Sequence, residues 1–186
     1  MGTSGNFSTV VARQPLRLAI TPSGTFKGEL DAAQILEMDE RAEAVGGARV
    51  SAEALLHVEI VRARGAGAVL HTHSIWSTLL SGRFGDQGGF AIEGYEMLKG
   101  LEGVRSHEHR EWLPIVENDQ DMPRLAAVVR KTFDAHPAAH CVLLRRHGLY
   151  TWGVDLSQAV RHVEILEFLL EAVGRQAFSY QPSAVS

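Results

Sequence analysis

The decisive stretch of this sequence is Gly65-Ala66-Gly67-Ala68-Val69-Leu70-His71-Thr72-His73. Its apolar run has the composition of a buried strand, and the glycines before it are typical of the end of a helix. Side chains alternate along a strand with period two, so His71 and His73 leave the same face at the strand's end. The pair is therefore placed to share one divalent ion, although two partly buried or capping histidines would show the same spacing.

A third histidine, His147, stands in a second strand-like run at residues 141–152. Three histidines that leave one coordination position open to water or substrate are typical of a catalytic zinc site. The sequence therefore predicts a metalloenzyme. A rival pair, His107 and His109, lies among charged residues and is interpreted as part of a solvated loop. The histidines at 136, 140 and 162 are interpreted as loop or helix-surface residues, and His57 as a capped or half-buried helix residue.

Composition restricts the class of protein. The chain has 186 residues, 45% of them hydrophobic, which suits one domain over residues 1–186 with a loose tail from about 181. A net charge of −4 with scattered arginines argues against a nucleic-acid partner. The single cysteine, Cys141, is expected to be a buried thiol. No apolar run approaches the length of a membrane-spanning helix, and the first residues lack a signal-peptide pattern, so we expect a cytoplasmic protein without membrane contact.

Hydrophobic periodicity predicts strands mixed with helices on one core, hence an α/β sandwich of layers. The expected strands lie at residues 7–11, 16–20, 34–38, 66–71, 113–116, 141–146 and 149–152. The expected helices lie at 52–64, 75–80, 123–135 and about 155–178, and residues 90–100 start extended and become helical near Tyr95. Ser51 is expected to cap the helix at 52–64, and Pro114 suggests that its strand lies at an edge.

Three segments are suited to binding an anion. Gly2-Thr3-Ser4-Gly5-Asn6 and Thr21-Pro22-Ser23-Gly24 present hydroxyl and backbone N–H groups, and Ser51 adds a hydroxyl at the positive end of a helix. Each is a common turn or cap when taken alone. Together with a metal site they favour a phosphorylated substrate.

Two carboxylates compete for acid–base work. Glu96 lies among apolar residues that would raise its pKa. Glu53 lies in the first turn of the helix at 52–64, where an acid also stabilises the helix dipole without any chemistry. The residues themselves leave this choice open.

These motifs resemble, in their order, those of the class II aldolase/adducin family. The stretches that carry the resemblance are Gly2 to Ser8, Ile20 to Gly24, Ser51-Ala52-Glu53, Leu70 to His73 and Arg146 to Leu149. The resemblance spans residue 2 to about 170. It implies a three-layer α/β/α sandwich with a central, mostly antiparallel sheet, and a homotetramer of C4 symmetry with sites between neighbouring subunits. It also implies one zinc ion per subunit on His71, His73 and His147, and a phosphate loop from Asn6, Ser23, Gly24 and Ser51, with Lys99 as a weaker source of positive charge.

Within the family, residues 93–100 and 145–153 resemble the members that remove water from a phosphorylated methylthio-ketose in methionine salvage. That resemblance assigns the acid–base role to Glu96, whereas the sugar-phosphate aldolases place theirs at the position of Glu53. An aldolase or epimerase with the same zinc site is the alternative, and a non-catalytic, adducin-like scaffold is a more distant one. Family members usually carry a helix before the first glycine-rich loop, and this sequence begins at that loop.

Overall fold

One mixed sheet organises the chain in the computed structural model, which describes residues 5–46 and 48–179. Its eight strands lie in the order β3-β2-β1-β4-β8-β7-β6-β5, and only the β6–β7 pair is parallel. The strands are β1 Asn6–Arg13, β2 Leu16–Ile20, β3 Leu36–Asp39, β4 Ala68–Thr72, β5 Gly89–Ile92, β6 Glu111–Val116, β7 Cys141–Leu144 and β8 Gly148–Gly153. The expected mostly antiparallel sheet is confirmed.

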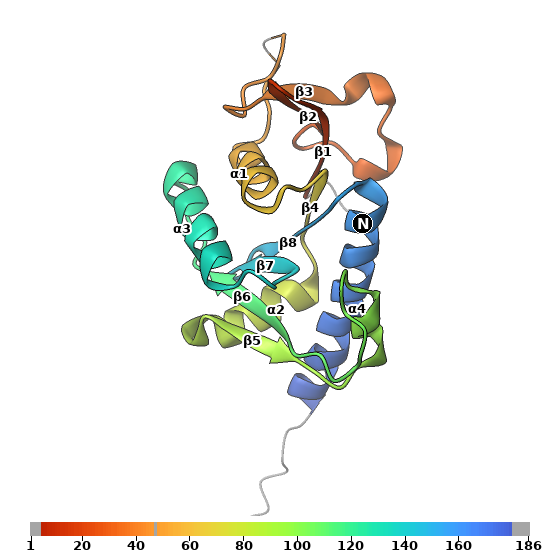
Figure 1. The fold of residues 1–186 in the computed structure, drawn as a ribbon. Coiled ribbons are helices and arrows are strands. Elements are labelled where there is room, and N and C mark those ends of the chain that lie inside the picture. Colours follow the sequence, from red (N-terminus) through yellow and green to blue (C-terminus); the bar gives the residue numbers. More distant parts are fainter. Residues whose placement is uncertain (1–4, 47, 180–186) are drawn as a thin grey trace, which may run out of the picture.

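Helices cover both faces of this sheet, as Figure 1 shows for α3 on one side and α4 on the other. The helices are α1 Ala54–Arg64, α2 Ile75–Phe84, α3 Met122–Ala135 and α4 Leu156–Ser179. Strand β7 shows how the two cores are divided. Val142 packs in the core beneath α1 and α3, whereas its neighbour Leu143 packs in the core beneath α2 and α4. Successive side chains of a strand point to opposite faces, so one apolar strand supplies both layers. The layered α/β/α prediction is confirmed.

Several boundaries differ from the sequence prediction. The N-cap of α1 is Glu53, so the prediction that Ser51 caps this helix is wrong by two residues. Strand β6 lies between β7 and β5, so the edge position suggested by Pro114 is also wrong. The segment after β5 forms a short 3-10 helix, η4, over Glu96–Gly100. Residues 2–4 of the first glycine-rich loop and the expected loose tail from 181 lie outside the described residues.

None of the helices in the described ranges is both long and apolar enough to cross a membrane.

Candidate metal centre

The end of β4 brings two histidines to one point. His71 pairs with Tyr150 of β8, and His73 is the first residue after the strand. The side chain of His71 is fully buried, and its Nδ1 lies 3.0 Å from the Leu149 carbonyl oxygen. A carbonyl can only accept a hydrogen bond, so Nδ1 carries the proton and Nε2 presents its lone pair. The Nε2 atoms of His71 and His73 lie 2.7 Å apart, and their separation fits two lone pairs that converge on one cation.

A tight turn between β7 and β8 supplies His147. Arg146 has a φ of 56°, in the left-handed region that non-glycine residues seldom adopt. Its backbone N–H donates to the Ser81 hydroxyl at 2.9 Å, and the His147 N–H donates to the Leu144 carbonyl at 3.0 Å, which together hold the turn. The ring of His147 then lies with its centroid 4.6 Å from that of His73 and 5.0 Å from that of His71.

Gly148 explains how these rings can approach so closely. A Cβ atom at this position would lie 2.3 Å from the Thr72 carbonyl oxygen and 2.9 Å from both His71 Cε1 and His73 Cδ2. Such distances are far shorter than van der Waals contact, so any side chain here would push β4 and β8 apart. The glycine after His147 is therefore needed by the packing of the histidines themselves.

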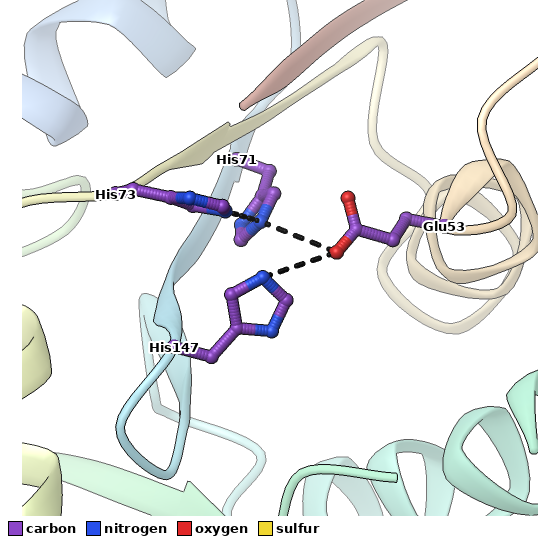
Figure 2. A group of neighbouring side chains, drawn as sticks. All are labelled: Glu53, His71, His73 and His147. Carbon is purple, nitrogen blue, oxygen red and sulfur yellow. Dashed lines mark hydrogen bonds and ion pairs between the residues drawn. The ribbon is translucent and has the colours of Figure 1, made fainter. Parts of the chain in front are cut away.

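Glu53 joins the three histidines from the start of α1 (Figure 2). Its Oε1 lies 3.1 Å from His147 Nε2 and 3.8 Å from His71 Nε2, and its Oε2 accepts a hydrogen bond of 2.7 Å from the Asn6 side-chain amide. Burial acts to raise the pKa of Glu53. The hydrogen bond with His147 and the charges of the nearby histidines outweigh this effect and lower the pKa from its ordinary value of 4.5 to about 2. Glu53 is therefore a carboxylate at neutral pH.

The four side chains fit a metal ion. One ligand atom from each of Glu53, His71, His73 and His147 lies within 4.8 Å of all the others. Ion–nitrogen distances of about 2.1 Å put two ligands of a tetrahedral zinc about 3.4 Å apart, so small side-chain movements would complete the site. Burial lowers the pKa of His71 to about 3, so its nitrogen is unprotonated and available as a donor at neutral pH. The sequence prediction grouped the three histidines, and the structure adds Glu53 to them.

A cavity of about 600 Å³ adjoins this cluster. It is lined by the two serines predicted to bind phosphate, Ser23 and Ser51, together with Glu53 and His147. Arg49 and Asn118 also line it, and the sequence analysis missed both. The Asn118 side-chain oxygen lies 3.3 Å from His147 Nδ1, so it orients that ring. Arg49 stands two residues before Ser51, and this proximity in sequence is the one feature that could have pointed to it. An isolated arginine has no pattern in a single sequence that marks it as a phosphate ligand.

The other predicted residues take different places. Asn6 is buried and engaged with Glu53, and Gly24 has a φ of 71° in the loop beside Ser23. Glu96 lies on η4 with 71% of its side chain exposed, where it forms ion pairs with Lys99 and His107. The expectation that apolar neighbours raise its pKa is wrong, because the hydrogen bond from Lys99 lowers the pKa of Glu96. Neither Glu96 nor Lys99 belongs to the metal cluster or to the lining of its cavity within the described part of one chain.

A family model described as the class II aldolase and adducin N-terminal domain matches residues 1–173. The chain belongs to the class II aldolase and adducin family. This membership agrees with the resemblance inferred from the motifs and with the layered fold around the histidines.

Relatives within the family are similar over most of their length. The chain is 44% identical over 171 residues to a methylthioribulose-1-phosphate dehydratase of Pseudomonas fluorescens (strain Pf0-1), with 91% of this chain and 81% of the relative covered. It is 43% identical to the protein of the same name from Methylococcus capsulatus, with the same coverage. Within the family, the chain is thus similar to dehydratases over nearly all of the matched domain.

Solved structures of the family share the fold. An L-fuculose 1-phosphate aldolase superposes with a TM-score of 0.76 at 23% identity, covering 100% of this chain and 81% of the other. The L-fuculose-1-phosphate aldolase of Thermus thermophilus superposes with a TM-score of 0.74 at 22% identity, covering 96% of this chain and 86% of the other. At 22–23% identity these superpositions show the shared fold and carry no argument about the reaction.

Proposed function

We propose that this protein is a cytoplasmic, metal-dependent hydro-lyase that converts 5-methylthioribulose 1-phosphate to 2,3-diketo-5-methylthiopentyl 1-phosphate in methionine salvage. The observation that carries the proposal is the cluster of three histidines and a carboxylate in a chain 44% identical to a methylthioribulose-1-phosphate dehydratase. The substrate has a ketone at C2, hydroxyls at C3 and C4, and a phosphate at one end. It therefore offers oxygen ligands for a cation and an anion for the neighbouring cavity.

In this proposal His71, His73 and His147 hold one zinc ion per subunit. When bound, zinc supplies a Lewis acid that withdraws electrons from oxygen atoms of the substrate. Two hydrogen bonds orient the rings of His71 and His147 for this role. The Leu149 carbonyl and the Asn118 side chain each occupy the remaining nitrogen of a proposed ligand, which fixes the direction of the other nitrogen. Glu53 balances the positive charge and keeps His147 in place.

The substrate phosphate is proposed to lie among Ser23, Gly24, Ser51 and Asn6, at the positive end of α1. Lys99, the weaker predicted source of positive charge, pairs with Glu96 and does not line the cavity of its own chain. Arg49 lines the cavity together with both serines and is the better candidate for this role. A guanidinium suits the task because it donates two parallel hydrogen bonds to phosphate oxygens.

Glu96 is proposed as the acid–base catalyst. It would take the proton from C3 and return a proton to the C4 hydroxyl, which leaves as water, and the enol so formed would become the diketone. In one chain this carboxylate faces solvent, so the role requires that η4 reaches the metal centre of a neighbouring copy. A homotetramer with sites between subunits, as the family resemblance implies, would satisfy this requirement. Because Glu96 is exposed in one chain, its carboxylate is accessible to such a neighbour.

The test is to incubate purified, metal-analysed protein with 5-methylthioribulose 1-phosphate and to follow the product by mass. We expect loss of one water, abolished by a chelator. Glu96→Gln should keep the metal and the oligomeric state, measured by light scattering, and lose turnover. Glu93→Gln is the matched control, since Glu93 is an equally exposed carboxylate three residues away that pairs with Arg110. Near-normal dehydration by Glu96→Gln would remove the assignment of that residue.

A sugar-phosphate aldolase or epimerase is the second candidate, and the position of Glu53 favours it. The aldolase members place their acid–base glutamate at this position, and here it contacts the histidines directly. Glu53→Gln should therefore abolish an aldolase and leave measurable activity in a dehydratase. Retro-aldol products in place of a diketone would select this alternative.

A further inference from the structure

Tyr150 lies against the buried histidine of the metal centre. Strands β4 and β8 pair His71 directly opposite Tyr150, and directly opposed residues of an antiparallel pair project from the same face. The two rings stack with their centroids 3.9 Å apart and an angle of 13° between their planes. Both side chains are essentially inaccessible to solvent. The face of the imidazole is thus covered by a second flat ring.

Two constraints then act on the His71 ring. The hydrogen bond from Nδ1 to the Leu149 carbonyl fixes which edge of the ring points away from the cluster. That bond alone allows the ring to tilt about the line through the donor and acceptor. The Tyr150 ring blocks this tilt, because an offset stack keeps the two planes nearly parallel. Together the two contacts leave Nε2 one direction, toward His73 and Glu53.

The hydroxyl group of Tyr150 does not account for its presence. Within the part of the chain that the structure describes, this buried oxygen has no hydrogen-bond partner. Unpaired buried hydroxyls cost free energy, so the hydroxyl itself does not stabilise this environment. The ring also meets the edge of His57 at a centroid distance of 5.8 Å, and His57 is fixed in turn by Ser8, whose hydroxyl lies 2.8 Å from His57 Nδ1. The Tyr150 ring therefore contacts two histidines, His57 and His71, each of which is fixed by a hydrogen bond.

We infer that Tyr150 is a positioning residue for the metal centre: its ring fixes the orientation of His71 and thereby raises the affinity for the metal. The inference rests on the proposed role of His71 as a ligand. It assigns the effect to the aromatic ring and none of it to the hydroxyl.

The experiment compares metal affinities by titrating apo-protein with Co²⁺ against a competing chelator, and records the visible spectrum of bound Co²⁺. Tyr150→Phe keeps the stack and should bind Co²⁺ as the wild type does. Tyr150→Met keeps a similar volume without a ring and should bind at least about 10-fold more weakly, with a changed spectrum, as is usual when support of a ligand is lost. Tyr150→Leu serves as a second variant without a ring.

Trp152→Leu is the matched control. Trp152 stands two residues along β8, on the same face and in the same core, and its ring packs on Phe133 and Arg64. Its removal should lower stability and leave Co²⁺ affinity unchanged. The inference would be overturned if Tyr150→Met bound Co²⁺ with wild-type affinity, or if Trp152→Leu lost as much Co²⁺ affinity as Tyr150→Met. It would also be overturned if neither variant without a ring folded in the presence of metal. His71→Ala separates the two proposals, since retention of metal there would mean that the metal centre itself is wrongly placed.

Discussion

Replacing the buried carboxylate of Glu111 should reveal an internal ion pair that the metal centre does not use. Glu111 is 1% exposed and accepts hydrogen bonds from His109 Nε2 at 2.8 Å, and from the backbone N–H and Nδ1 of His140, each at 3.0 Å. The other ring nitrogen of His140 lies 2.9 Å from the Glu102 carbonyl oxygen. Both nitrogens of His140 therefore face acceptors, which requires the doubly protonated, cationic ring.

The pKa directions agree with this geometry. Burial lowers the pKa of His140, but the hydrogen bond and charge of Glu111 raise it above its ordinary value of 6.5. Burial raises the pKa of Glu111, but His140 lowers it below 4.5. The histidine contributes stability in full below pH 6.5 and loses it as the pH rises through its raised pKa. The carboxylate contributes above pH 4.5 and loses its contribution as the pH falls through its lowered pKa. Both contributions to stability are therefore complete between pH 4.5 and pH 6.5.

Glu111→Gln should therefore lower the free energy of unfolding most at about pH 5.5. Removing one partner of a buried ion pair costs about 3–5 kcal/mol, and we expect the lower end because His140 can relieve part of the cost by losing its proton. The measurement is urea unfolding of metal-loaded protein at one concentration, at pH 5.5, 7 and 9. The loss should shrink between pH 5.5 and pH 9, because His140 loses its proton as the pH rises through its raised pKa.

An exposed ion pair provides the control for this variant. Glu37 lies 3.9 Å from Arg17 with about half of its side chain exposed, so Glu37→Gln should change the free energy of unfolding by less than about 1 kcal/mol. A loss for Glu111→Gln that is below about 1 kcal/mol, or that does not depend on pH, would refute the cationic state of His140.

Two further predictions concern the candidate site. Gly148→Ala should lower stability by about 2 kcal/mol and weaken Co²⁺ binding, because its Cβ would meet both His71 and His73; unchanged affinity in a chelator competition would show that the histidines tolerate the extra atom. Arg49→Gln should raise the KM for the phosphorylated substrate about 10-fold with little change in kcat, since a charged hydrogen bond contributes about 1.5 kcal/mol or more. Arg41→Gln, an exposed arginine outside the cavity, is its control, and equal KM values for the two variants would exclude Arg49 from phosphate binding.

The sequence predicted those parts of the site that depend on local geometry. The shared face of His71 and His73 follows from the period of a strand, and His147 was the third candidate because it stands in a second strand-like run. Glu53 reaches these histidines because β1 brings α1 and β4 together. Asn6 of β1 lies opposite His71 of β4, and its side-chain amide donates a hydrogen bond to Glu53. Such a contact between distant segments has no periodicity, so a single sequence offered Glu53 only as one of two competing acids.

Histidines outside the site show the same limit. His162 was predicted at a helix surface, yet it is buried and lies 2.8 Å from the Trp152 carbonyl oxygen. His140 was assigned to a loop, yet it is half of the ion pair with Glu111. A histidine has the same letter whether it is solvated, paired or neutral and buried, and only its partners across the sheet decide among these states.

The misplaced helix start is informative about function. Ser51 has the side chain of a good N-cap, and the local rule placed it there, but α1 begins two residues later with Glu53 as the cap and no side-chain capping bond. The Ser51 hydroxyl accepts only a long bond of 3.3 Å from the Glu53 N–H and a marginal one from Asn6, and it lines the cavity. If Ser51 were the N-cap of α1, its hydroxyl would accept a hydrogen bond from a backbone N–H of the first helical turn. Positions where a local preference fails are expected to be functional or strained sites. The departure at Ser51, like the left-handed Arg146 before His147, therefore supports the assignment of this cavity as the place where substrate binds.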